Sequence, residues 1–308
     1  MILPAARVRF VAIEEDGRLI GGMPVIAERR GGLHRLYAMP VGLPGAPLAR
    51  RGAHAAVDRA AAHALAALER GLNAAGGLWT LYRPCGPEVE TESLAALSGE
   101  TRWLDTWLID LDRGLSAARA RLEGSLRYDL RRSRSLGLQC REEPEALEEA
   151  YALHLRQSRR WPGARPIPLE VTRRLLAPTG RDPGAEPPAR LFTARDERGL
   201  AAAIFFLDHA HEVLAWWSGA RPGARAQRAI AHVYWWAAEW AEARGRVRLN
   251  LGGSAGQPGL EAFKRSLGGR RVRFPARWLG AVHAPWPARL ADSLRRRLGG
   301  SRYRGEPA

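Results

Sequence analysis

Short apolar runs separated by turn-forming residues indicate that much of this chain forms β-strands. Residues 7–13 and 18–27 are two such runs, and the EEDG between them is typical of a hairpin turn. Further runs, enriched in branched and aromatic side chains, lie at 33–40, 78–84, 106–111, 190–196, 200–208, 212–220, 246–253 and 270–275. The pattern therefore predicts many short strands.

Longer segments place apolar residues three or four positions apart, which is the spacing of one helix face. These predicted helices lie at 54–72, 115–137, 144–160, 225–245 and 259–269. In 115–137 the apolar positions are Leu115, Ala118, Leu122, Leu126 and Leu130. Since helices and strands alternate, we expect an α/β fold of the α+β kind with a mixed sheet.

The two halves of the chain repeat one order of elements: a strand meander, a loop rich in proline and glycine, an alanine-rich helix and a strand. RLIGGMPVIA at 18–27 corresponds to GLAAAIFFLD at 199–208. Matching elements lie roughly 170 to 180 residues apart, a typical domain length. The first half lacks the two helices that open the second. The predicted divisions are 1–108, 109–280 and a basic tail at 281–308.

The 308-residue chain has a formal net charge of +16, which predicts an anionic partner: nucleic acid, a phosphorylated substrate or an anionic membrane surface. A bias toward arginine explains the charge equally well. Cys85 and Cys140 are the only cysteines, so no disulfide framework and no metal site are expected. With no signal-peptide pattern and no run of about 18 apolar residues, we expect a cytoplasmic protein.

Lys264 is the only lysine in the chain, since every other basic side chain except histidine is an arginine. An ammonium group is a compact charge with three donors, and the planar fork of arginine does not replace it at a tight site. Lys264 is therefore a candidate functional residue. The alternative is a solvated lysine that remains by chance.

Three segments resemble a known family: RVRLNLGGSAGQPGLEAFKRSLGG at 246–269, LRYDLRRSRSLGL at 126–138 and the strands and loop at 19–49. They resemble the Gcn5-related N-acetyltransferase (GNAT) fold, and two copies in tandem resemble the FemAB-type family. The resemblance implies two tandem GNAT domains, the first truncated. It also implies an acyltransferase that moves an acyl or aminoacyl group from an activated donor to an amine, best known on a cell-wall precursor.

The same resemblance implies roles for four residues. Lys264 would stabilise the negative charge that develops on the acyl carbonyl during transfer. Phe263 would form an apolar wall, and Gly252 and Gly253 would let the backbone approach the ligand. The alternative is an ordinary amphipathic helix with its apolar residues in the core.

The activated donor stays open between acyl-coenzyme A and aminoacyl-tRNA, and no bound cofactor is expected. Coenzyme A-using relatives carry a phosphate-binding loop, and the corresponding SGARPGARAQR at 218–228 departs from its spacing. Arg221, Gly223 and Arg225 are the candidates for the donor phosphates, because they lie where a helix begins.

An anionic or nucleotide-linked acceptor is the partner predicted for the basic helix, where Tyr128 and Arg131 lie about one turn apart. A solvated helix face is the alternative.

Trp216 and Trp217 are expected on opposite faces of a strand, so one lies in the core and Trp217 is the candidate to line a cleft.

An alternative function is a catalytically inactive GNAT-fold module that binds RNA, such as tRNA, or an anionic membrane surface.

Overall fold

The computed structural model divides the chain into two compact units. We call residues 105–272 the C-terminal unit, and the described parts of 2–104 and 273–308 the N-terminal unit. The chain passes between them inside β6 (Glu100–Asp110) and again inside β12 (Arg270–Leu279). The described residues are 6–30, 33–39, 45–72, 74–80, 82–83, 96–97, 99–135, 137–159, 166–178 and 185–279.

These units differ from the predicted divisions at 108 and 280. The end of β12 belongs to the N-terminal unit because Ala276 to Leu279 pair with β5 (Ala74–Thr80). Strand pairing between distant segments is not visible in the local pattern that placed the boundary. The predicted basic tail at 281–308 lies outside the described residues.

The N-terminal unit is a mixed sheet covered by one helix. The elements preceding β5 are β1 (Ala6–Glu15), β2 (Arg18–Arg30), β3 (Leu33–Tyr37), β4 (Leu48–Ala49) and α1 (His54–Gly71). Strands β1, β2 and β3 are antiparallel, β5 is parallel to β3, and β12 is antiparallel to β5. Val57, Ala61 and Leu65 share the buried face of α1, as their helical spacing predicts.

The C-terminal unit contains a sheet with strands in the order β6, β11, β10, β9, β8, β7. All pairs are antiparallel except β10 with β11. The mixed sheet expected from the sequence is therefore confirmed. The further strands are β7 (Gln139–Glu142), β8 (Ala189–Asp196), β9 (Gly199–Asp208), β10 (Glu212–Ala220) and β11 (Arg248–Asn250).

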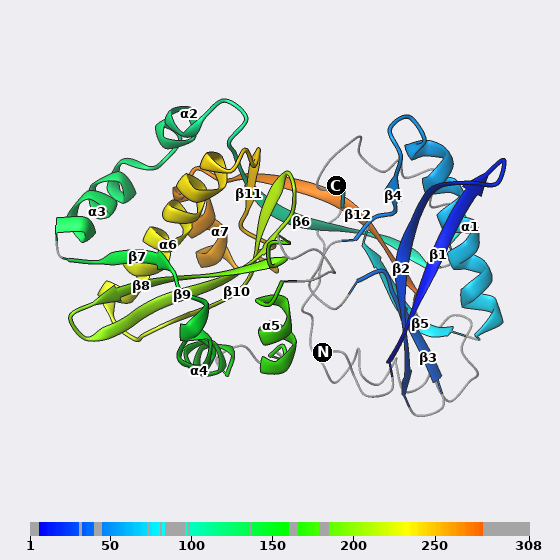
Figure 1. The fold of residues 1–308 in the computed structure, drawn as a ribbon, viewed down its shortest axis with the longest axis horizontal. Helices are drawn as coiled ribbons and strands as arrows, with labels where there is room; N and C mark the ends of the chain where they lie inside the picture. The colour runs from blue at the N-terminus through cyan, green and yellow to red at the C-terminus, as the bar shows by residue number, and fades with distance from the viewer. Residues whose placement is uncertain are drawn as a thin grey trace. The chain divides into compact units, whose positions relative to one another are not determined.

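Helices cover both faces of β8, β9 and β10 (Figure 1). On one face α6 packs with α2 and α3 around Phe192 and Phe206, and on the other α4 and α5 pack around Phe205 and Trp217. The helices of this unit are α2 (Leu115–Ala120), α3 (Gly124–Ser135), α4 (Leu147–Ser158), α5 (Leu169–Leu175), α6 (Ala224–Ala243) and α7 (Pro258–Ser266).

The single helix predicted over 115–137 is wrong, because α2 and α3 are separate helices. Between them the Glu123 N–H donates to the carbonyl oxygen of Ser266 (3.0 Å), so it leaves the helical hydrogen-bond ladder. The predicted apolar face nevertheless holds, since Ala118, Leu122 and Leu130 are buried in one core. The pattern also missed α5, β7 and the short β4.

The two units share one order of connections. In each, three antiparallel strands lead into a helix, and the next strand lies parallel to the third strand of the meander. These segments are β1–β2–β3–α1–β5 and β8–β9–β10–α6–β11. The shared order supports the prediction that the first unit is a truncated copy of the second, and that statement stays a prediction.

Candidate active site

Strands β10 and β11 run side by side only briefly and then part. Their pairing ends at Leu214 and Asn250. The chain after Asn250 stays with β6, since the Leu251 N–H donates to the carbonyl oxygen of Trp107 (2.8 Å). Strand β10 continues to Ala220 with β9 as its other neighbour. Within the part of the chain that the structure describes, this end of β10 therefore has one edge without a strand partner.

A β-bulge in β10 lies where the strands part. Ala215 pairs with Phe206 and Trp217 pairs with Phe205, so Trp216 is the extra residue. A bulge bends and twists its strand, and bulges are frequent next to functional sites.

A buried polar cluster connects the three strands at this point. The Asn250 Oδ1 accepts hydrogen bonds from the Thr106 Oγ1 (2.5 Å) and the Gly252 N–H (2.9 Å). The Asn250 Nδ2 donates to the Glu212 Oε1 (2.7 Å). The side chains of this cluster are buried, so each bond satisfies a group that water does not reach. The sequence pattern did not predict this cluster, although the lone asparagine in an apolar strand was a usable signal.

Lys264, on α7, closes the turn that follows β11. Its Nζ donates to the carbonyl oxygens of Gly252 and Gly253, at 2.7 Å each, and the residue is only 2% exposed. Burial lowers the pKa of Lys264 to about 8, while the negative charges of Asp105 and Glu261 act in the opposite direction. The alternative of a solvated lysine is therefore wrong. A compact ammonium fits between two carbonyls where a guanidinium fork would not.

The two glycines of this turn are required for different reasons, the first for its backbone conformation and the second for lack of space. Gly252 has a φ of 74°, in the region that favours glycine. A Cβ on Gly253 would lie 2.9 Å from the carbonyl oxygen of Asp105. The next residue, Ser254, is fully buried, and its Oγ has no hydrogen-bond partner among the described residues. The turn is thus closely packed and contains one unused hydroxyl.

Phe263 adjoins Lys264 on α7 and is half-buried. Its ring centroid lies 6.1 Å from that of Tyr234 on α6, so it packs against the core of this unit. Of the residues predicted for the site, the structure therefore brings together Lys264, Gly252 and Gly253, with Phe263 on the same helix.

Trp217 is not part of this group. It is 5% exposed and stacks on Phe205, with ring centroids 5.2 Å apart. Trp216 packs against the same core, although alternation predicted opposite faces for the two residues. That prediction is wrong because the bulge at Trp216 interrupts the alternation of side chains.

The candidate donor phosphate residues lie between β10 and α6. The Arg221 guanidinium donates to the Asp196 Oδ2 (2.5 Å) and to the carbonyl oxygen of Arg198 (2.9 Å), so the turn between β8 and β9 holds it. Gly223, with a φ of 120°, precedes the first residue of α6. The side chain of Arg225 lies outside the described residues.

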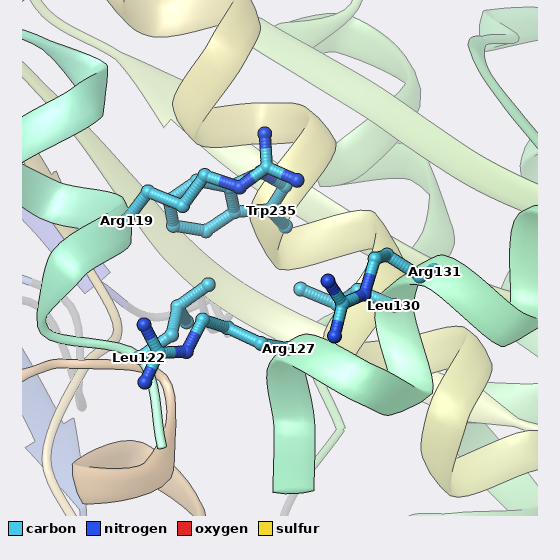
Figure 2. Close-up of a pocket in the computed structure, with 6 residues that line it drawn as sticks. All are labelled: Arg119, Leu122, Arg127, Leu130, Arg131 and Trp235. Carbon is cyan, nitrogen blue, oxygen red and sulfur yellow. The ribbon is translucent and has the colours of Figure 1, made fainter. Parts of the chain in front are cut away.

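The candidate acceptor residues lie on α3. Tyr128 is exposed, and Arg131 lines a surface pocket between α2, α3 and α6 (Figure 2). Tyr128 is not among the lining residues of that pocket. None of the pocket residues belongs to the turn that Lys264 closes, so the acceptor candidates and the catalytic candidate form two separate groups.

A comparison with a family model identifies the fold of the C-terminal unit. Residues 117–265 match the model described as the acetyltransferase (GNAT) domain. This segment, just under half of the chain, has the GNAT fold. The match includes the parting strands, the glycine turn and Lys264, and it confirms the GNAT fold that the resemblance implied.

Solved structures with the same fold cover most of the chain. FemX has a TM-score of 0.65 and 11% identity, over 89% of this chain and 88% of that chain. The C-terminal domain of a putative lysylphosphatidylglycerol synthetase from Agrobacterium fabrum has a TM-score of 0.56 and 14% identity, over 94% and 89%. A conserved protein of unknown function from Bacteroides thetaiotaomicron has a TM-score of 0.55 and 13% identity, over 88% and 84%. No curated protein sequence matches the chain.

At these identities the likeness is one of fold, and the FemAB-like fold expected from the sequence is confirmed.

Two further observations concern the described residues alone. None of their helices is long and apolar enough to cross a membrane. No three histidine, cysteine, aspartate or glutamate side chains among them are grouped as metal ligands.

Proposed function

We propose that this chain transfers an acyl or aminoacyl group from an activated donor to an amine. The observation that carries the proposal is the parting of β10 and β11, beside a bulge and a glycine turn, inside a GNAT domain. An open strand edge presents backbone N–H and C=O groups to an extended ligand that itself contains amides. An acyl donor with a linear amide-containing arm fits such an edge.

The reaction forms a C–N bond and breaks the C–S or C–O bond of the donor. The amine attacks the donor carbonyl, a tetrahedral oxyanion forms, and the leaving thiol or hydroxyl takes up the proton that the amine loses. The positive charge of Lys264 favours the oxyanion, and its two hydrogen bonds hold the turn in place. Since these bonds occupy two of its three donors, one N–H is left for the acyl oxygen.

The donor is either acyl-coenzyme A or aminoacyl-tRNA, and the proposed acceptor is an amine of a cell-envelope precursor, as the FemAB-type resemblance implies. Purified protein is incubated with labelled acyl-coenzyme A or aminoacyl-tRNA and a panel of amines, and transfer of the label is measured. Consumption of one donor with amide formation is the expected result. No transfer from either donor would overturn the proposal.

A pair of glycine variants tests whether the turn is the site. A Cβ on Gly252 would lie 3.4 Å from the carbonyl oxygen of Ala215 and 4.0 Å from the Lys264 Nζ. Gly256 has a similar φ, 69° against 74°, but a Cβ there meets nothing within 4 Å. We expect Gly252→Ala to lower kcat/KM by about 10- to 100-fold through misplacement of reacting groups. Gly256→Ala, with similar backbone strain, should act like wild type; equal losses in the two variants would contradict the assignment.

A second candidate is the inactive basic module that binds RNA or an anionic membrane surface. The exposed arginines of α2 and α3 favour it. The absence of turnover, together with binding to tRNA or to anionic vesicles, would support this candidate over the enzyme.

A further inference from the structure

The pocket between α2, α3 and α6 has a charged rim and an apolar floor. We call it the arginine pocket. Leu122, Leu130 and Trp235 are buried and form the floor, and the three arginines are exposed (Figure 2). Its lining residues are Arg119, Leu122, Arg127, Leu130, Arg131 and Trp235.

The three rim arginines carry uncompensated charge. Within the described part of the chain, no acidic side chain pairs with the guanidinium of Arg119, Arg127 or Arg131. Two of the acids close to them in the sequence have other arginine partners. Asp110 pairs with Arg121 (3.3 Å), and Asp129 on α3 pairs with Arg228 on α6 (3.2 Å). A bound anion would offset the repulsion among three like charges around one pocket.

The arrangement of the arginines suits phosphate better than carboxylate. Arg127 and Arg131 are one helical turn apart on α3, and Arg119 comes from α2, so the arginines of the rim come from two helices. A carboxylate has two oxygens in one plane, which match a single guanidinium fork. A phosphate group has three or four oxygens arranged tetrahedrally and accepts from several forks at once.

The apolar floor of the pocket narrows the class of ligand further. Leucine side chains and an indole face there offer apolar contact to the carbon atoms of an esterified phosphate. The chemistry that fits both rim and floor is a phosphate group joined to a carbon skeleton.

We propose that the arginine pocket is a binding site for the phosphate group of a phosphate ester, either a soluble one or a phospholipid headgroup. The proposal does not depend on acyl transfer, because the pocket shares no residue with the Lys264 turn. It is tested by binding alone.

The test compares two triple variants with equal charge. One replaces Arg119, Arg127 and Arg131 with Gln. The control replaces three exposed arginines of the N-terminal unit with Gln, namely Arg9, Arg18 and Arg59. Each variant loses three positive charges, so its formal net charge falls from +16 to +13. Any difference in phosphate affinity between the two variants is therefore due to the pocket and not to the overall electrostatic field of the protein.

Inorganic phosphate is the first probe, titrated into each protein by calorimetry at low ionic strength. We expect the pocket variant to bind phosphate about tenfold or more weakly than wild type, since charge-assisted hydrogen bonds are lost. The control variant should stay within about twofold, because none of its three substitutions removes a hydrogen-bond donor from the pocket. Circular dichroism melts check that each variant is folded. If the pocket variant is not, Arg131→Gln against Arg59→Gln replaces the pair.

Vesicles are the second probe and separate the two sources of phosphate. Cosedimentation is measured with vesicles of phosphatidylglycerol and phosphatidylcholine, and with phosphatidylcholine alone as the control. A loss of inorganic phosphate binding confined to the pocket variant, with no binding of the wild type to phosphatidylglycerol vesicles, indicates a soluble ester. A loss of phosphatidylglycerol binding confined to that variant indicates a lipid headgroup. Equal behaviour of the two triple variants with both probes, or no binding by wild type, would overturn the proposal.

Discussion

Lys264→Met should change how the stability of the protein depends on pH. Methionine keeps an unbranched apolar stem and removes the ammonium. Burial lowers the pKa of Lys264 to about 8, compared with 10.5 for an unperturbed lysine. At about 1.36 kcal/mol per pH unit, this difference corresponds to about 3 kcal/mol.

The direction in which the free energy of unfolding changes with pH follows from the number of protons bound in the folded and unfolded states. Between pH 8 and 10.5 the unfolded chain holds a charged Lys264 while the folded chain holds a neutral one. The unfolded state then binds more protons, so the free energy of unfolding rises with pH. Wild type should therefore gain about 3 kcal/mol relative to Lys264→Met across this window, and the difference should be constant below pH 8.

At neutral pH two effects of the substitution oppose each other. The variant no longer buries a charge, which favours it by about 3 kcal/mol. It also leaves the Gly253 carbonyl without the Lys264 donor, at a cost of about 1–3 kcal/mol. The Gly252 carbonyl keeps the Trp107 N–H as a donor (3.2 Å). We therefore expect the two proteins to differ by less than about 2 kcal/mol at pH 7.

Urea unfolding at pH 7, 8, 9 and 10, followed by tryptophan fluorescence, measures both curves. Lys264 is the only lysine in the chain, so no other lysine titrates in this window, and tyrosine titration is common to both proteins. Parallel curves from pH 7 to 10 would refute the reasoning that burial lowers the pKa of Lys264. Arg265→Met, at the exposed neighbouring position, is the control and should run parallel to wild type.

Three further substitutions test the packing around the site, and a fourth, Gly71→Ala, is a control. Gly219→Ala should cost about 1–3 kcal/mol in urea unfolding, because its Cβ would lie 2.5 Å from a backbone nitrogen of α4. Gly71→Ala, with nothing within 4 Å of the new Cβ, should not destabilise the protein. Asn250→Asp places a second buried carboxylate beside Glu212, so we expect the variant to lose roughly 3–5 kcal/mol relative to wild type in urea unfolding at pH 7. Ser254→Ala removes a buried hydroxyl that has no partner among the described residues, so its free energy of unfolding should change by less than about 1 kcal/mol; a larger loss would reveal a hydrogen bond there.

The sequence by itself determined the elements and the outline of the fold. Helix α1 was predicted at 54–72 and is observed at His54–Gly71. The hairpin at EEDG is observed with Asp16 and Gly17 at positive φ. These features follow from local periodicity and turn chemistry, which act over a few residues and are written directly in the order of side chains. The single lysine was also visible as a compositional exception.

Tertiary structure decided which of those residues meet. The break between α2 and α3 depends on a carbonyl of α7, more than a hundred residues away in the sequence. The position of Trp217 depends on a bulge, and Arg221 is held by Asp196 from a neighbouring turn. Lys264 is buried because two backbone carbonyls of another segment surround its Nζ. Such contacts join distant parts of the chain, and their energies come from burial and hydrogen-bond geometry that no local pattern contains.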